Sequence, residues 1–330
     1  MLTLINKDEI LDLVTLRDYE TKIGENILTG SVSELAKKGV KFVLFGAEES
    51  IGPRANFGNS GSENAWNSFL NAFLNTQENP FIDVSKIGVL GSFKFEMEID
   101  EINSLREQTK NIDKELEAVI EDIVNHKMIP ILIGGGHNNA YPLLKGSANA
   151  FGHALNAINC DPHADFRPLE GRHSGNGFSY AMNEGALNKY FILGLHQNYN
   201  GKSIYKMFED ANKDGIKVSW TYFDNWIYGK STMEHDLEIG IQFVKDRNVG
   251  LELDMDAIAY MPSSACGPSG IQLNEARMYI CKCAANLNVA YLHLPEAGPC
   301  NKSENKMVGK SLAYLVIDFI KNRGLNNINS

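Results

Sequence analysis

Short, almost continuously apolar segments recur along the chain and predict strands that are covered on both faces of a sheet. Eight such strands are expected, at 41–47, 86–92, 129–135, 154–160, 190–196, 216–223, 249–255 and 288–294. Stretches with helical periodicity lie between them, such as 62–75, 101–126, 231–246, 272–285 and 303–323. This alternation predicts a mostly parallel α/β sheet flanked by helices.

The rest of the sequence shows no sign of a second domain. The length of 330 residues suits one large α/β unit, with neither an internal repeat nor a low-complexity linker. We expect a helical N-terminal extension over 1–39 and a frayed tail over 325–330. The segment "IGPRANFGNSGSENAW" at 51–66 predicts a long loop, which either serves a ligand or is ordinary surface.

Composition excludes several classes of protein. The 41 acidic residues outnumber the 31 basic ones, giving a net charge of −10 that argues against a nucleic-acid partner. The charged N-terminal segment does not resemble a secretory signal, and no apolar run approaches the ~18 residues of a membrane span. Five cysteines without a framework spacing fit a reducing compartment, so a cytoplasmic protein is predicted.

Polar residues follow four of the predicted strands. His137 follows 129–135, the segment "DPHAD" follows 154–160, and Glu296 follows 288–294. Asp254 lies at the end of 249–255, and Asp256 comes directly after it. Ligands of parallel sheets bind at the carboxyl ends of the strands, where all these residues are expected. Each cluster alone has an ordinary explanation, because two aspartates at a strand end often cap the next helix.

The segment "DPHAD" at 161–165 is harder to explain without a ligand. In an extended chain its acids and its histidine point to one side, where two carboxylates repel each other unless a cation lies between them. The second aspartate pair adds two more carboxylates to the same edge. We therefore predict metal ligands at His137, Asp161, His163, Asp165, Asp254 and Asp256.

This ligand set contains carboxylate oxygen and imidazole nitrogen but no thiolate. It favours Mn²⁺, with Fe²⁺, Co²⁺, Ni²⁺ or Zn²⁺ as alternatives. Six ligands exceed the needs of one tetrahedral ion and suit two ions that share an activated water. Two Mn²⁺ ions per subunit are expected.

Three motifs of the chain resemble the metal-binding signatures of the ureohydrolase family, which comprises arginases, agmatinases and formimidoylglutamases. The family signatures GGxH, DAHxD and (S)xDxD correspond to "GGGH" at 134–137, "DPHAD" at 161–165 and "LELDMD" at 251–256. The resemblance spans residues 40–320 and implies a single three-layer α/β/α domain around an eight-stranded parallel sheet.

The family pattern also divides the ligands between two ions. It implies that His137 and Asp165 bind one ion, whereas His163 and Asp256 bind the other. The two remaining acids, Asp161 and Asp254, would bridge the ions.

Departures from the family pattern point to the formimidoylglutamase-like branch. Ala259 stands where arginases and agmatinases carry a further acid, and Arg167 fills the position at which formimidoylglutamase-like enzymes carry an arginine. Pro162 replaces the usual alanine of DAHxD and removes an N–H that a strand end does not need. The implied reaction is hydrolysis of N-formimidoyl-L-glutamate to L-glutamate and formamide, with water activated between the ions attacking the amidine carbon.

The resemblance assigns catalytic roles to three residues. Asp165 would orient the attacking water, and His173 would move a proton to the leaving amine. Glu296 would pair with the cationic nitrogens of the substrate, although it could instead be a solvated loop carboxylate.

The acidic substrate requires a basic residue in the pocket. Arg167 is expected to bind a substrate carboxylate, with a structural salt bridge as the alternative. Arg172 and Arg54 are weaker candidates for the same contact.

Other functions remain open from the sequence. The chain could be an arginase, an agmatinase or another guanidino-acid hydrolase, but agmatine has no carboxylate for Arg167 to bind. A deacetylase on the related fold needs only one zinc and fewer ligands. A non-catalytic metal-binding homologue would be expected to lack ligands. Family resemblance also implies a homo-oligomer, a trimer or a hexamer.

Overall fold

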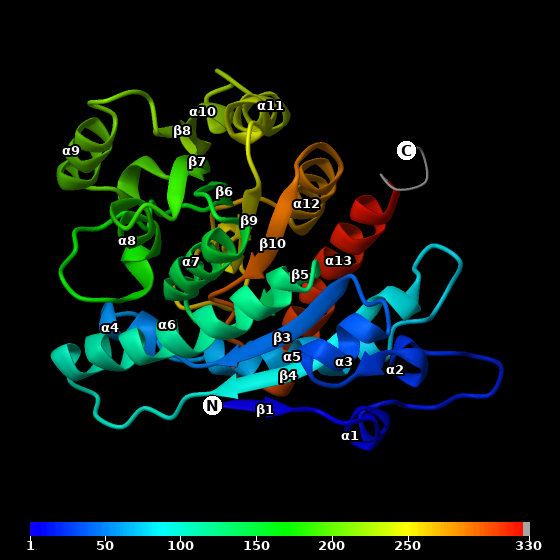
Figure 1. The fold of residues 1–330 in the computed structure, drawn as a ribbon. Coiled ribbons are helices and arrows are strands. Elements are labelled where there is room, and N and C mark those ends of the chain that lie inside the picture. Colours follow the sequence, from blue (N-terminus) through cyan, green and yellow to red (C-terminus); the bar gives the residue numbers. More distant parts are fainter. Residues whose placement is uncertain (326–330) are drawn as a thin grey trace.

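The computed structural model describes residues 1–325 of the chain and builds them around one central sheet (Figure 1). The strands of this sheet are β1 (Leu2–Leu4), β2 (Leu28–Thr29), β3 (Phe42–Glu48), β4 (Ile87–Lys94), β5 (Ile129–Ile133), β6 (Leu155–Cys160), β7 (Leu187–Leu195), β8 (Val218–Tyr222), β9 (Val249–Leu253) and β10 (Val289–Leu294).

Helices fill most of the connections between the strands. They are α1 (Lys7–Asp12), α2 (Ile23–Asn26), α3 (Val32–Lys37), α4 (Ile51–Ala55), α5 (Ala65–Leu74), α6 (Ile102–Asn125), α7 (Ala140–Phe151), α8 (Gly177–Asn183), α9 (Lys202–Ala211), α10 (Phe223–Ile227), α11 (Met233–Val244), α12 (Leu273–Asn286) and α13 (Lys302–Leu325).

The spatial order of the strands is β1-β4-β3-β5-β10-β9-β6-β7-β8, with β2 paired to β4 outside this path. All the pairings between these strands are parallel except that of β1 with β4. Strands β5 and β6 are separated in space by β10 and β9, which come from the last third of the chain. The strands that precede the predicted metal ligands and Glu296 are therefore four consecutive neighbours.

Two hydrophobic cores lie on opposite faces of the sheet. Side chains of α5, α11, α12 and α13 fill one core, and those of α4, α6, α7, α8 and α9 fill the other. Strand β3 supplies both by alternation, since Phe42 and Leu44 belong to the first core and Val43 and Phe45 to the second. The result is the expected three-layer α/β/α arrangement (Figure 1).

The structure corrects three details of the sequence-based expectation. All eight predicted strands are present, but β1 and β2 enlarge the sheet to ten strands, so the segment 1–39 is not purely helical. These two strands have three and two residues, too few for an alternating pattern to be recognised. The predicted loop at 51–66 begins with helix α4 and includes a 3-10 turn at 62–64.

The predicted frayed tail at 325–330 lies outside the described residues, apart from Leu325 at the end of α13. Among residues 1–325, no helix has the length and apolar character needed to cross a membrane.

Candidate metal centre and active site

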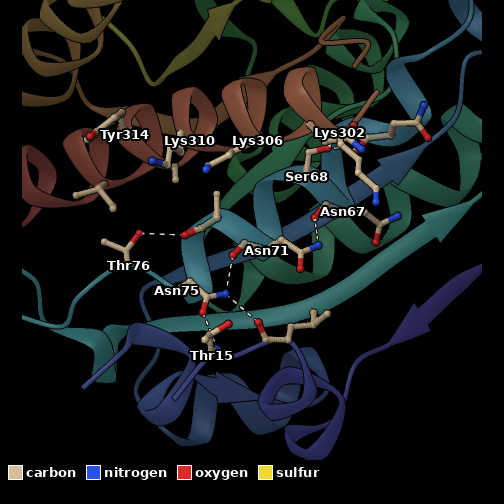
Figure 2. Close-up of a pocket in the computed structure, with 16 residues that line it drawn as sticks. Thr15, Asn67, Ser68, Asn71, Asn75, Thr76, Lys302, Lys306, Lys310 and Tyr314 are labelled. Atoms are coloured by element: carbon tan, nitrogen blue, oxygen red, sulfur yellow. Dashed lines mark hydrogen bonds between the residues drawn. The ribbon is translucent and has the colours of Figure 1, made fainter. Parts of the chain in front are cut away.

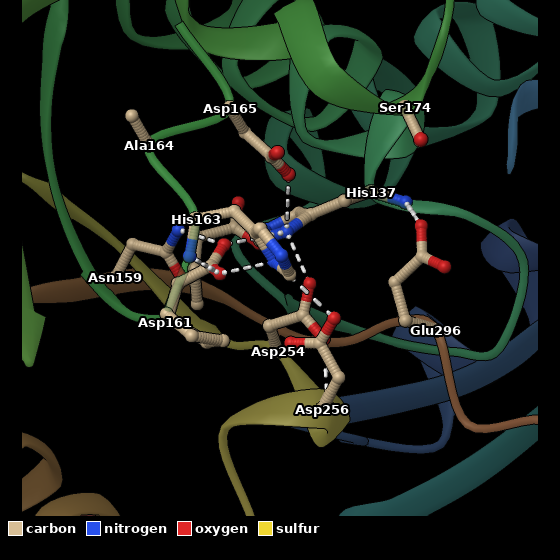
Figure 3. A network of polar contacts seen from close by, with 12 residues as sticks. His137, Asn159, Asp161, His163, Ala164, Asp165, Ser174, Asp254, Asp256 and Glu296 are labelled. Carbon is tan, nitrogen blue, oxygen red and sulfur yellow. Dashed lines mark hydrogen bonds and ion pairs between the residues drawn. The ribbon is translucent and has the colours of Figure 1, made fainter. Parts of the chain in front are cut away.

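All six predicted metal ligands lie together at the carboxyl ends of three strands, β5, β9 and β6, of the same sheet (Figure 3). His137 follows β5, the acids and histidine of 161–165 follow β6, and the aspartates of 254–256 follow β9. Glu296 follows β10, which lies between β5 and β9 in the sheet. Parallel pairing thus brings together segments that are more than a hundred residues apart in sequence.

The tight turn before His137 depends on glycine and on a buried acid. Gly135 has a φ of +68°, and a Cβ at this position would lie 2.3 Å from Nδ2 of Asn139. The carboxylate of Glu49 accepts hydrogen bonds from the backbone N–H of Gly136 at 2.8 Å and from the side-chain amide of Asn139 at 3.0 Å. Glu49 therefore fixes the turn that delivers His137.

Three carboxylates converge on one nitrogen of His137. Its Nδ1 atom lies 2.9 Å from Asp254 Oδ2, 2.9 Å from Asp165 Oδ2 and 3.2 Å from Asp161 Oδ2 (Figure 3). An imidazole nitrogen carries at most one proton, so it cannot satisfy three carboxylates at once. This convergence indicates a place for a multivalent cation.

A second group of ligands surrounds His163. Its Nδ1 atom lies 3.3 Å from Asp256 Oδ2 and 3.5 Å from Asp161 Oδ1. Asp161 therefore faces both histidines, one with each oxygen, as a bridging ligand would. Asp254 belongs to the first group and meets the second through the backbone N–H of Asp256, which donates to its Oδ1 at 2.8 Å.

The cluster carries more negative charge than the protein neutralises. Within residues 1–325 neither lysine nor arginine pairs with its four acids, and Oδ1 of Asp256 is buried without a hydrogen-bond partner. Burial, aided by neighbouring acids, raises the pKa of Asp165 to about 6 and that of Asp254 well above its usual range. Burial opposes protonation of His137, but the surrounding acids still raise its pKa. The donor set fits two divalent ions as compensation.

Two carboxylates of the site are held on strained backbone. Asp165 has a φ of +45° and Glu296 a φ of +69°, in the left-handed region that residues other than glycine rarely adopt. Such conformations cost about 1–3 kcal/mol each and are concentrated at functional sites. Here the strain aims both acids at the same cluster.

Glu296 is buried beside the metal ligands and is not a solvated loop residue. Its Oε1 atom accepts a hydrogen bond from the backbone N–H of His137 at 2.7 Å, and its Oε2 atom accepts one from the hydroxyl of Ser264. Burial, together with the charge of Asp254, raises the pKa of Glu296 to about 8. A cationic group placed against it would favour the ionised form.

A cavity of about 500 Å³, here called the strand-end cavity, opens over this cluster. Its walls include His163, Asp165, Asp254, Asp256 and Glu296. Arg167 is the one arginine or lysine among the described residues that line it. The Arg167 side chain is 46% exposed, and its Nε atom lies 3.1 Å from Oε1 of Glu170.

The structure places Arg172 and Arg54 away from the cavity, contrary to expectation. Arg172 is buried with its Nε atom 2.9 Å from Asp113 on α6, and its guanidinium lies over the rings of Tyr141 and Tyr180. Arg54 points outward to Asp100, with Nη2 at 2.8 Å from Oδ2. Each cation is thus held by an acid outside the site.

His173 is buried next to the cavity but does not line it. Its Nδ1 atom accepts a hydrogen bond from the backbone N–H of Gly175, and its Nε2 atom lies 3.3 Å from Glu170. Burial, together with the charges of Arg167 and Arg106, lowers the pKa of His173 to about 4. Its contact Glu170 does line the cavity.

Sequence reasoning missed three buried or cavity-lining acids near the cluster. Glu49 directly follows β3 at the same sheet edge, and Glu252 keeps the two-residue spacing of Asp254 and Asp256 within "LELDMD". Both patterns were visible in the sequence. Glu170 had no such signal, because its position depends on the path of the loop after β6.

A larger cavity of about 700 Å³ lies elsewhere, between α5 and α13 (Figure 2). We call it the α5–α13 groove. Lys302, Lys306 and Lys310 line one wall, and Asn67 and Asn71 belong to the opposite helix. These lysines are exposed, and none of the metal-ligand candidates reaches the groove. The larger cavity therefore lacks the chemistry of the smaller one.

Comparisons with known proteins find relatives of similar sequence. Formimidoylglutamase from Geobacillus sp. (strain WCH70) is 27% identical over 280 residues, which cover 83% of this chain and 81% of that protein. The formimidoylglutamase of Streptococcus pyogenes serotype M12 (strain MGAS2096) is 22% identical over 235 residues, 68% of this chain and 71% of that protein.

Solved structures show the same fold. The crystal structure of Trypanosoma cruzi formiminoglutamase with Mn²⁺ matches with a TM-score of 0.74 and 17% identity, covering 92% of this chain and 98% of the other. Formimidoylglutamase from Bacillus subtilis matches with a TM-score of 0.74 and 19% identity, covering 94% of both chains. The sequence model of the arginase family matches residues 40–320. The chain belongs to the arginase family.

Proposed function

We propose that this chain is a metal-dependent hydrolase that cleaves the amidine C–N bond of N-formimidoyl-L-glutamate and releases L-glutamate and formamide. The observation that supports it best is the convergence of three carboxylates on Nδ1 of His137, to which neither lysine nor arginine is paired within residues 1–325. The curated relatives reported above are named for the same activity.

The proposal assigns the six clustered side chains to two divalent ions. His137 and Asp165 would hold one ion, His163 and Asp256 would hold the other, and Asp161 and Asp254 would contribute to both. Two ions bound there would lower the pKa of a water molecule between them and offset charge that develops on the substrate. Mn²⁺ is the proposed metal, and Fe²⁺, Co²⁺, Ni²⁺ or Zn²⁺ are the alternatives.

The protein side chains then bind and orient the substrate. Glu296 accepts hydrogen bonds from the amidine nitrogens, which holds the amidine carbon against the metal centre. Arg167 is the basic residue available for a substrate carboxylate, and its partner Glu170 must release it when the substrate enters. Asp165 orients the attacking water.

Cleavage also requires a proton on the leaving nitrogen. Water adds to the amidine carbon, the bond from this carbon to the glutamate nitrogen breaks, and that nitrogen gains a proton. The attacking water is the source of this proton, and Glu170, which lines the cavity and contacts Nε2 of His173, can relay it to the leaving nitrogen. We further expect a cytoplasmic homo-oligomer, a trimer or a hexamer.

Product analysis tests this proposal. Protein reconstituted with Mn²⁺ is incubated with N-formimidoyl-L-glutamate, arginine or agmatine, and formamide, glutamate and urea are measured. We expect formamide and glutamate in equal amounts and no urea. Urea alone would refute the substrate and leave a guanidino-acid hydrolase, whereas no product with bound Mn²⁺ would favour a non-catalytic homologue.

A further inference from the structure

A buried carboxylate, Glu252, lies in the sheet directly behind the metal-ligand cluster. It belongs to β9 and pairs in register with His293 on β10. Its Oε1 atom accepts a hydrogen bond from the hydroxyl of Tyr291 at 2.7 Å, and its Oε2 atom lies 2.7 Å from Nδ1 of His293. All three side chains are completely buried.

The same carboxylate reaches the first metal-ligand group. Oε2 of Glu252 lies 3.3 Å from Nε2 of His137, on the side of the ring opposite to the three converging acids. The approach has the distance but not the direction of a hydrogen bond, and Nε2 has no other partner in the described residues. Neither lysine nor arginine contacts Glu252 within residues 1–325.

This arrangement matches a general feature of metal sites. A histidine that binds a metal through one ring nitrogen commonly donates its other N–H to a carboxylate, which fixes the ring and its protonation. Glu252 stands at the position of the serine in the family signature (S)xDxD. A serine would be shorter and would carry no charge, so this chain has an added anion behind His137.

We propose that Glu252 is a positioning residue for metal binding. Its negative charge beside Nε2 favours the proton on that nitrogen and leaves the lone pair of Nδ1 for the ion, while Tyr291 and His293 hold Glu252 in place. This inference rests on the proposed function only in requiring that the cluster binds divalent ions; it is independent of the substrate.

Calorimetric titration of the metal-free protein with Mn²⁺ tests the inference. The Glu252→Gln variant keeps the shape of the side chain and removes its charge. We expect the affinity for one of two Mn²⁺ ions to fall by about 10–100-fold. The affinity for the other ion should be nearly unchanged, because Glu252 has no contact with His163 or Asp256.

A matched control separates positioning from loss of stability. Asp318 is a mostly buried acid of α13 that pairs with Arg277 far along the chain from the ligands. Asp318→Asn should lower the thermal unfolding temperature of the metal-free protein without changing Mn²⁺ affinity. Should Glu252→Gln fail to fold, Tyr291→Phe provides a milder variant, in which the affinity for the same ion should fall by a smaller factor.

The outcomes distinguish the two hypotheses. Equal Mn²⁺ binding by Glu252→Gln and the unmodified protein would overturn the positioning role alone. A loss of affinity that affects both ions equally, or that also occurs in Asp318→Asn, would overturn it as well. If the unmodified protein binds no Mn²⁺, the proposed function fails and the inference fails with it.

Discussion

The strand-end cavity and the α5–α13 groove differ in size and in charge. The groove is larger, at about 700 Å³ against about 500 Å³, and its lysines are exposed to solvent. The cavity instead meets buried acids that contact two histidines and have no lysine or arginine partner in the described part of the chain. Water screens exposed charges at little cost, whereas buried charges need a specific partner. Buried charge without such a partner, more than volume, identifies the functional site.

The largest expected effect comes from Asp161, the acid shared by both ligand groups. Asp161→Ala should reduce turnover by more than about 100-fold, since loss of an outer partner of a ligand already costs about 10–100-fold. The rate of formamide release at saturating Mn²⁺ measures this turnover. A chelator should abolish the activity of the unmodified protein. If the turnover of Asp161→Ala stays within a few-fold of that of the unmodified protein, the strand-end cavity would no longer be identified as the functional site in preference to the groove.

Arg172 shows what a buried charge does when it is fully paired. Arg172→Ala leaves Asp113 buried without its cation and should lower the free energy of unfolding by about 3–5 kcal/mol. Urea denaturation of the metal-free protein measures this change. A stable variant with a raised KM would instead return Arg172 to substrate binding.

His173 gives a prediction about pH. Its pKa is lowered to about 4 in the folded protein, so its neutral form stabilises the fold above pH ~6.5 and this contribution is lost as the pH falls through 4. Relative to the His173→Asn variant, the free energy of unfolding of the unmodified protein should fall by roughly 3 kcal/mol between pH 7 and pH 4. Urea denaturation at several pH values measures both. Parallel curves for the two proteins would contradict the buried neutral state.

Arg167 should have a smaller effect, because it is partly exposed and already paired. Arg167→Ala should raise KM for an acidic amidine by about tenfold, within the range for a hydrogen bond to a charged group, and should change kcat little. Steady-state formamide release measures both parameters. An unchanged KM would leave the Glu170 ion pair as the only role of Arg167.

The groove should have the smallest effect. The double substitution Lys306→Gln and Lys310→Gln should leave Mn²⁺ affinity, turnover and KM unchanged, because neither lysine lines the strand-end cavity. The same assays provide the measurement. A loss of turnover would show that the groove communicates with the site.

Eight strands could be predicted because each is an almost continuously apolar run. The six clustered residues could be predicted because acids and histidines follow these runs at strand ends. The strands β1 and β2 could not, since two or three residues carry no period. The sequence ranked Arg172 below Arg167 for the pocket but could not exclude it: five residues apart in one loop, they face Asp113 and the cavity, respectively. That choice depends on where α6 places an acid, which is a tertiary property.

The order of strands β5, β10, β9 and β6 has a consequence for biosynthesis. When the segment "DPHAD" has been synthesised, the growing chain contains two of the three signatures. The gap between β5 and β6 nevertheless stays open until β9 and β10 have been made. The ions can be captured only after nearly the whole polypeptide has left the ribosome, because a preformed site does not exist before then. Metal uptake would thus report the completion of folding.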